Sequence, residues 1–219
     1  MTDAGYHTPV EEYAEAIFTL GEEGTAVIAA RLAERLDRSA PSVSEMLDRM
    51  EVDGLLFRNG RSISLTSEGI RLAETVIRRH RLAERLLVDV IGLEWHKAHV
   101  EAGRWEHVIS AAVEEKLIAL LGNPTTCPHG NPIPGSPAGP ARIERSLDLE
   151  EMPGLVDIVR ISESLEYDEG SMASLERVGA IPGKSATLRF TDAQRELVTA
   201  EGVLEVNDAL AAQLFVAVR

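Results

Sequence analysis

The sequence lacks the features that mark secreted and membrane proteins. Its 219 residues contain a single cysteine, Cys127, which excludes an internal disulfide framework. No apolar run approaches the roughly 18–20 residues that span a bilayer. Residues 1–15 are acidic and lack the basic segment and apolar stretch of a signal peptide. These absences predict a cytoplasmic protein without a membrane partner.

The sequence also lacks the positive charge that draws proteins to nucleic acid. Acidic residues outnumber basic ones by 36 to 22, which gives a formal net charge of −14. Because DNA is a polyanion, binding to it must depend on local geometry and on a trigger that offsets negative charge. The hydrophobic fraction of 44% excludes a disordered chain and is sufficient for buried hydrophobic cores.

The N-terminal part has the element order of a winged helix-turn-helix. Apolar spacing predicts helices over 9–20, 27–36 and 41–53, the last with Ser39 as its N-cap. Two short strands then flank Asn59-Gly60, a strong hairpin signal. This order favours DNA binding, although a helical hairpin followed by a plain β-ribbon would give the same pattern.

Two long amphipathic helices are predicted next, over 67–90 and 93–121. Helices of this kind after a winged helix usually pack against a second copy, so we expect a homodimer. Residues 122–141 hold six of the 10 prolines and form either a linker or an ordered loop. Beyond them, strands over 156–161, 185–190 and 202–206 and a short helix over 172–178 predict a small β-rich domain.

Five of the six histidines fall within 50 residues, close to acidic side chains. His80 and Glu84 are one helical turn apart, and His99, Glu106 and His107 share a face of the next predicted helix. Facing helices with imidazoles and carboxylates are how metal sites are built in helical proteins. The alternative is that His80, which lies in a basic run, belongs to a face that is merely solvated.

Cys127 and His129 form a second candidate ligand pair, suited to a borderline or soft metal. The pair cannot close a structural zinc site alone, and without a second cysteine pair a zinc finger is excluded. A buried thiol beside a loop histidine is the alternative. The sequence contains no nucleophile elbow, no HExxH and no phosphate-binding glycine loop, so we do not expect an enzyme.

The chain resembles the diphtheria toxin repressor family of iron- and manganese-dependent transcriptional regulators in three stretches, HRLAERLL (80–87), RWEHVIS (104–110) and CPHGNPIPG (127–135). The resemblance implies a dimeric repressor that binds double-stranded operator DNA, as one dimer or two. It implies a mainly α fold with small β parts in three domains: a winged helix-turn-helix over 1–72, a helical metal-binding and dimerisation domain over 73–141, and an SH3-like C-terminal domain over 142–219.

The family's regulatory metal position falls here on Glu12, Gly103, Glu106 and His107. Iron-responsive relatives carry Met and Cys at the first two positions, whereas manganese-responsive relatives carry acids. Since Gly103 has no side chain, a water, a backbone carbonyl or Glu101 would complete the site. Carboxylate, imidazole and water suit Mn(II). We therefore expect a Mn(II)-dependent repressor of metal-uptake genes, with a Fe(II)-dependent repressor of iron-uptake and siderophore genes as the alternative.

The family's second metal position takes one of two ligand sets, and both occur in this chain. The first set is His80, Glu84 and His99. The second, found in relatives that resemble streptococcal manganese regulators, combines Glu84 with Cys127, His129 and an acid of the C-terminal domain, here Glu163 or Asp168. Up to two metal ions per chain are expected, and the resemblance leaves the choice between the sets open.

The third helix and the hairpin carry the candidate DNA contacts. Hydroxyls and arginines suit phosphates, and Pro41 suits a thymine methyl group. Glu45 can accept from cytosine N4 but is repelled by phosphate. The full set is Arg31, Ser39, Pro41, Ser42, Ser44, Glu45, Arg49, Arg58 and Arg61.

Overall fold

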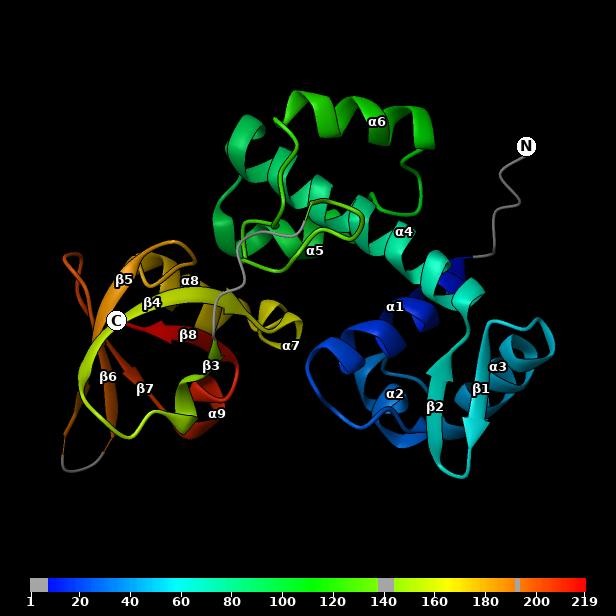
Figure 1. Ribbon diagram of the computed structural model, residues 1–219, viewed down its shortest axis with the longest axis horizontal. Helices are drawn as coiled ribbons and strands as arrows, with labels where there is room; N and C mark the ends of the chain where they lie inside the picture. Colours follow the sequence, from blue (N-terminus) through cyan, green and yellow to red (C-terminus); the bar gives the residue numbers. More distant parts are fainter. Residues whose placement is uncertain (1–7, 138–143, 192–193) are drawn as a thin grey trace. The chain divides into compact units, whose positions relative to one another are not determined.

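The computed structural model describes residues 8–137, 144–191 and 194–219, which divide into two compact units between Arg79 and His80. The first unit is the predicted winged helix-turn-helix, drawn in blue and cyan in Figure 1. Its elements are α1 (Thr8–Glu22), α2 (Ala29–Arg35), α3 (Ala40–Val52), β1 (Leu56–Asn59), β2 (Ser62–Leu65) and the first part of α4 (Ser67–Arg85). Strands β1 and β2 pair antiparallel, and Asn59 faces Ser62 across the predicted turn.

Helix α3 is held in place by its apolar face. Val43, Leu47 and Met50 are buried in one cluster with residues of α1 and α2. The helix begins as predicted, because the Ser39 hydroxyl accepts a hydrogen bond from the Ser42 amide. The opposite face of the helix is therefore left in solvent.

The predicted helix over 93–121 is wrong. The structure has a 3₁₀ turn η2 (Trp95–Lys97), α5 (Ala98–Ala102) and α6 (Ala111–Leu120) instead. Apolar residues continue on both sides of the break, but α5 ends before Gly103, and Ser110 caps a new helix by accepting from the Val113 amide at 3.4 Å. Glu106 and His107 consequently lie in a turn and not on the face of a helix.

The helical part of the second unit exposes an apolar surface. Helix α4 continues into a π-helical segment η1 (Leu86–Ile91) that ends at Gly92. Leu82 and Leu117 are buried, as the spacing predicts. Six large apolar side chains of this part remain exposed: Val90, Ile91, Val100, Val108, Val113 and Leu120. Exposed apolar surface of this kind marks a protein interface.

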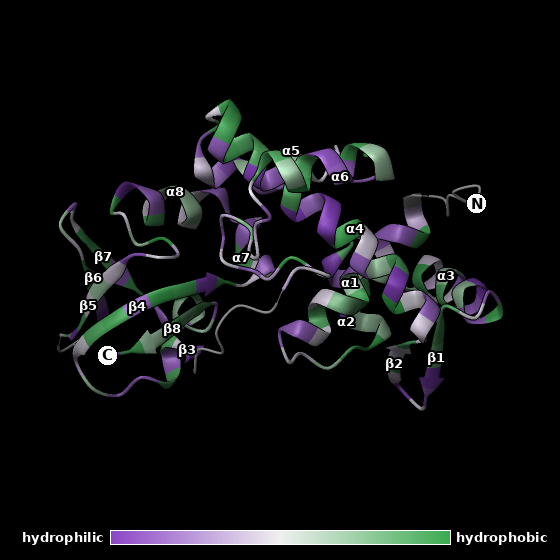
Figure 2. Ribbon diagram, turned by 45° about the horizontal axis from the view of Figure 1, so that its top comes forward, coloured by the Kyte–Doolittle hydropathy of each residue, from purple (hydrophilic) through white to green (hydrophobic). Residues whose placement is uncertain are grey.

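The C-terminal part of the second unit is a six-stranded antiparallel sheet with the strand order β3-β8-β4-β5-β6-β7. The strands are β3 (Arg145–Ser146), β4 (Gly154–Ile161), β5 (Ser185–Phe190), β6 (Arg195–Val198), β7 (Val203–Val206) and β8 (Leu214–Val218); the helices are η3 (Leu147–Leu149), α7 (Glu163–Glu166), α8 (Glu169–Arg177) and α9 (Asp208–Ala211). Strand β4 is mostly hydrophobic in Figure 2. The predicted fold class is confirmed, although β3, β6, β8, α7 and α9 were not predicted.

The described part of the proline-rich segment, 122–137, is an ordered loop attached to α4. Arg85 Nε donates to the Thr126 carbonyl at 2.7 Å, and buried Arg81 donates to the Pro132 carbonyl. The alternative that His80 lies on a merely solvated face is wrong, because His80, Arg81 and Glu84 are all buried. Residues 138–141 lie outside the described residues. No helix in the described ranges is long and apolar enough to cross a membrane.

The loop also approaches the sheet closely at Gly130. Its φ is +89°, and an added Cβ would lie 2.2 Å from the Val159 carbonyl oxygen, whereas Gly183, with φ +85°, has open space. Gly183→Ala should cost about 1–2 kcal/mol of left-handed strain. Gly130→Ala should cost more than about 3 kcal/mol, because backbone must move. Denaturant unfolding followed by fluorescence of Trp95 and Trp105, both in this unit, measures the difference; equal costs would contradict the close approach.

Candidate metal centre and recognition surface

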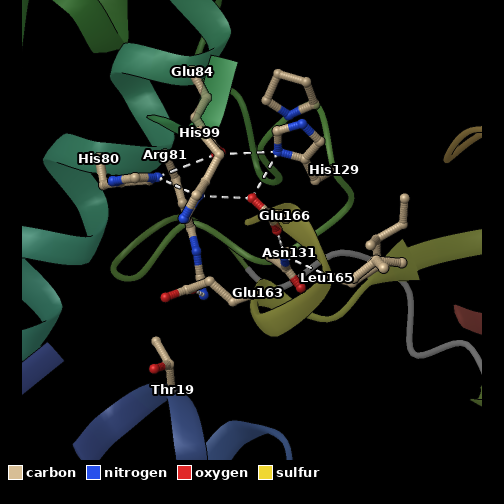
Figure 3. A network of polar contacts seen from close by, with 12 residues as sticks. Thr19, His80, Arg81, Glu84, His99, His129, Asn131, Glu163, Leu165 and Glu166 are labelled. Carbon is tan, nitrogen blue, oxygen red and sulfur yellow. Dashed lines mark hydrogen bonds and ion pairs between the residues drawn. The ribbon is translucent and has the colours of Figure 1, made fainter. Parts of the chain in front are cut away.

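Five buried side chains converge inside the second unit (Figure 3). His80 and Glu84 come from α4, His99 from α5, His129 from the 122–137 loop and Glu166 from α7. The helical spacing of His80 and Glu84 places both on one face. The residues arrive from four segments, so the site exists only in the folded unit.

The distances within this cluster are short. Glu84 Oε1 lies 3.2 Å from His80 Nε2, 3.3 Å from His99 Nδ1 and 3.1 Å from His129 Nδ1. Glu166 Oε2 lies 2.9 Å from both His99 Nδ1 and His129 Nδ1. The two ring nitrogens His80 Nε2 and His99 Nδ1 are 2.9 Å apart. Glu84 Oε1 thus contacts all three imidazoles, and Glu166 Oε2 contacts two of them.

Outer hydrogen bonds orient these groups. His129 Nε2 donates to the Trp95 carbonyl at 3.2 Å, which turns Nδ1 inward. Asn131 Nδ2 donates to Glu166 Oε1 at 2.7 Å, which turns Oε2 inward. Ligands of protein-bound metals are typically oriented by such second partners.

The cluster carries unusual charge for a protein interior. Burial opposes the charged form of His99, but the carboxylates of Glu166 and Glu84 outweigh it and raise its pKa to about 10. Burial likewise opposes ionisation of Glu84, yet His129 and His80 hold its pKa well below the usual range. Two ionised carboxylates in the interior require a positive partner.

Glu84 also shows that the residues fit a cation. Its second oxygen, Oε2, is buried and has no hydrogen-bond partner among the described residues. A buried carboxylate oxygen without a donor is costly unless it faces positive charge. Imidazole and carboxylate together are a common donor set for divalent transition metals.

The other predicted ligands of the second metal position, Cys127, Glu163 and Asp168, do not make the short contacts with the histidines that Glu84 and Glu166 make. Cys127 is buried, with ligand atoms of Glu84 and His129 within 4.8 Å. Glu163 does not join the cluster but pairs with Arg81 at 3.3 Å. Asp168 has no hydrogen bond or ion pair with the histidines in the described part of the chain and instead caps α8 by accepting from backbone amides at 3.2 Å.

The acid that meets the histidines is Glu166, which sequence reasoning missed. It lies three residues after the predicted Glu163, one turn along α7. The signal was present in the segment ESLE, where two acids at this spacing share a helix face. Only the position of α7 decides which acid points inward.

Three of the four predicted regulatory residues, Gly103, Glu106 and His107, lie in the second unit. Buried Glu106 has Oε1 3.1 Å from His107 Nε2, and its other oxygen accepts from His80 Nδ1. Burial opposes ionisation of Glu106, but the hydrogen bonds from His107 and His80 lower its pKa to about 2. At Gly103 an added Cβ would find ordinary contacts of 3.7 and 3.8 Å, so packing does not enforce the glycine.

Glu12 lies on α1 in the first unit. It is half-buried, and its carboxylate is 3.9 Å from Arg38 Nη2. At this distance and exposure the ion pair contributes little stability. The carboxylate therefore remains available as a ligand.

The exposed face of α3 carries most of the predicted DNA contacts. All six predicted contacts of this helix are exposed: Ser39 at its N-cap, Pro41, Ser42, Ser44, Glu45 and Arg49.

The predicted arginines differ in the partners that their guanidinium groups bind. Arg58 binds Asp48 at 2.7 Å and also Glu51, Arg49 lies 3.8 Å from Asp53, and Arg31 donates to the Ala26 carbonyl. Arg61, beside the hairpin turn, has no ion pair or side-chain hydrogen bond within the part of the chain that the structure describes.

Comparison with known proteins identifies relatives along the chain. The iron-dependent repressor N-terminal DNA-binding domain matches residues 7–62, and the iron-dependent repressor metal-binding and dimerisation domain matches residues 66–135. The iron-dependent repressor IdeR of Mycobacterium leprae is 42% identical over 203 residues, 88% of each chain. The diphtheria toxin repressor of Corynebacterium efficiens is 42% identical over 211 residues, 92% of this chain and 91% of the relative.

Solved structures are similar over nearly the whole length. A manganese-dependent transcriptional repressor in complex with manganese has a TM-score of 0.82 at 28% identity and covers 96% of this chain and 100% of its own. The repressor ScaR with bound Zn²⁺ has a TM-score of 0.78 at 25% identity, with 96% and 99% covered.

The charge of the cluster predicts a pH dependence for the metal-free protein. The pKa of His99 rises from 6.5 to about 10 on folding. Its stabilising contribution is therefore fully present below pH 6.5 and is lost as the pH rises through about 10. We expect the melting temperature of chelator-treated protein to fall over this interval by on the order of 10 °C. In Glu166→Gln the fall should be smaller; identical profiles from thermal scans would contradict the charge pairing.

Proposed function

This chain belongs to the diphtheria toxin repressor family of metal-dependent transcriptional repressors, and we propose that it is activated by Mn²⁺ and represses metal-uptake genes. Its family consists of DNA-binding regulators, not enzymes. The resemblance predicted from the sequence is thereby confirmed. The identity of the metal, the residues that hold it and the genes that are repressed are what we propose.

The donor chemistry at the regulatory position supports manganese. Glu12, Glu106 and His107 would hold the ion, which supplies positive charge between the two carboxylates. Glu12 stands where iron-responsive relatives have a thioether, and Gly103 supplies no thiolate, although a side chain would fit at Gly103. Oxygen-rich sets with one imidazole suit Mn²⁺, whereas soft sulfur ligands favour other metals. The absence of a side chain at Gly103 is the observation that most supports Mn²⁺ over Fe²⁺.

The winged helix supplies the second half of the function. Glu12 lies on α1, which packs against α2 and α3 in one core. Restraining Glu12 beside Glu106 and His107 would thus restrain α3, whose exposed face is the recognition surface. In a homodimer, two such helices can reach successive major grooves. DNA and metal should strengthen each other's binding to the same degree.

The apolar surface of the second unit supports a homodimer. Val90, Val100, Val108, Val113 and Leu120 are each about half exposed or more. The matching family domain is described as one for metal binding and dimerisation. We propose that these side chains form the contact between two copies, and that one dimer or two occupy an operator in the cytoplasm.

An Fe²⁺-dependent repressor of iron-uptake and siderophore genes is the second candidate. The names of the curated relatives favour it, since IdeR is an iron-dependent repressor. Neutralising Glu12 and Glu106 would activate the protein in the same way. The two candidates differ in the ion that the donor set prefers and in the genes that are repressed.

Operator binding titrated anaerobically with Mn²⁺ and with Fe²⁺ tests the proposal. We expect activation by Mn²⁺, loss of activation in Glu106→Gln, and no change in the exposed control Glu34→Gln. The double variant Glu12→Met with Gly103→Cys adds two soft ligands and should shift preference toward Fe²⁺ by about tenfold. Equal binding with Mn²⁺ and with chelator would reject metal activation, and stronger activation of the unaltered chain by Fe²⁺ would favour the second candidate.

The two wing arginines should behave differently on DNA. Arg61→Ala removes a side chain that is free to meet a phosphate, so the slope of log affinity against log salt should fall by about one. Arg58→Ala should change the slope less, because Asp48 and Glu51 hold its guanidinium. Fluorescence anisotropy with labelled operator at several salt concentrations measures both slopes. A larger change for Arg58→Ala would show that its ion pairs open on DNA.

A further inference from the structure

We propose that Glu45 of helix α3 sets the base preference of this repressor, because its unpaired carboxylate selects a cytosine in each half of the operator and disfavours the other bases. Glu45 lies within residues 7–62, the part of the chain that matches the family's DNA-binding domain. The inference deepens the proposed function and rests on it, since it takes the exposed face of α3 as the recognition surface. It holds whether Mn²⁺ or Fe²⁺ is the effector.

Glu45 lies on the solvent face of α3, opposite the core. The helix buries Val43, Leu47 and Met50 on its other side. At about 100° per residue, Glu45 is rotated by about 200° from Val43, so its exposed side chain points away from the core. It also lies in the N-terminal half of the helix, from which recognition helices contact base edges. The position of Glu45 is therefore one that reads bases.

The carboxylate of Glu45 differs from its neighbours in having no cationic partner. Asp48 and Glu51, the next acids of the helix, are both paired with Arg58 of the hairpin, Asp48 at 2.7 Å. The side chain of Glu45 has no ion pair or hydrogen bond within the described part of the chain. An unpaired carboxylate is repelled by the phosphates of DNA. It can favour binding only where a base supplies a hydrogen-bond donor to it.

The donors of the major groove narrow the choice of base. An ionised carboxylate only accepts hydrogen bonds. The groove offers donors from two bases, the N4 amino group of cytosine and the N6 amino group of adenine. The adenine amino group lies between two acceptors, its own N7 and the O4 of the paired thymine, and both repel a carboxylate. The cytosine amino group has an acceptor on one side only, the O6 of the paired guanine. Glu45 should therefore select cytosine.

The other bases present acceptors to this carboxylate. Thymine in place of cytosine turns the amino donor into the O4 acceptor, and guanine presents O6 and N7. Glu45 would then lose its hydrogen bond and face partial charge of its own sign. A neutral amide would discriminate less against these bases, because it carries both a donor and an acceptor. An acid at this position thus lowers affinity for random DNA and sharpens the choice of operator.

Pro41 limits where the cytosine lies in the half-site. It is exposed one helical turn before Glu45, on the same face. One turn rises about 5.4 Å and successive base pairs are about 3.4 Å apart, so contacts from the two side chains fall within about two base pairs. With Pro41 against a thymine methyl group, the thymine and the cytosine should be this close. In a homodimer the pair should occur once in each half-site, in opposite orientation.

Selection of bound sequences from a randomised DNA duplex library tests the inference. The full chain is saturated with Mn²⁺ or, anaerobically, with Fe²⁺, and the duplexes that it retains are sequenced. We expect a symmetric consensus with a cytosine in each half-site. Glu45→Gln should shift this position from cytosine towards adenine by about tenfold, because an amide pairs with adenine N6 and N7. Glu45→Ala should remove the preference there.

Asp48→Asn is the matched control on the same helix. It removes the same charge, but from a carboxylate that Arg58 already holds. It should change the affinity for all duplexes alike and leave the consensus as it was. Pro41→Ala should relax a thymine within about two base pairs of the cytosine. Circular dichroism and metal titration of each variant confirm that it is folded and binds metal as before.

Two outcomes would overturn the inference and leave the proposed function intact: the same consensus for Glu45→Gln as for the unaltered chain, or an equal shift of the consensus in Asp48→Asn. Failure of the proposed function is separate, because the unaltered chain would then retain no consensus sequence with either metal. That result would remove the recognition surface and this inference with it.

Discussion

Two buried carboxylates face three imidazoles in the second unit, and the arrangement of that unit depends on this contact. Glu84 and Glu166 cannot keep their charge in the interior without a positive partner. Helix α4, helix α5, the 122–137 loop and α7 each contribute one or two of the residues that meet there. Arg81 attaches both the loop, through Pro132, and α7, through Glu163. The short distances thus depend on packing far beyond the ligands themselves.

In the winged helix the problem is electrostatic repulsion, because an acidic protein must approach DNA, a polyanion. Helix α3 carries Glu45, Asp48 and Glu51, and Arg58 of the hairpin binds the latter two. This pairing offsets negative charge on the recognition helix and joins it to the wing. A metal ion at Glu12 and Glu106 would offset charge again, at the position where the proposal places activation. Local pairing thus lowers the negative charge of the face that the proposal assigns to DNA.

Much of the fold could be predicted from the sequence, since local signals agree with the packing. Ser39 caps α3, Asn59 begins the hairpin turn, and His80 with Glu84 shares a helix face. The break between α5 and α6 was not predicted, because apolar residues continue on both sides of the turn that ends near Ser110 and their spacing was read as one helix. Glu166 could not be separated from Glu163 and Asp168, because only the placement of α7 and the capping of α8 decide which acid faces the histidines.

The single thiol has a consequence for how the protein senses its surroundings. Cys127 is buried, and its raised pKa keeps it from becoming a nucleophilic thiolate. Peroxides and alkylating agents react with thiolates, and crosslinking of two chains needs an accessible sulfur. Oxidants and alkylating agents should therefore leave Cys127 unmodified as long as the second unit stays folded.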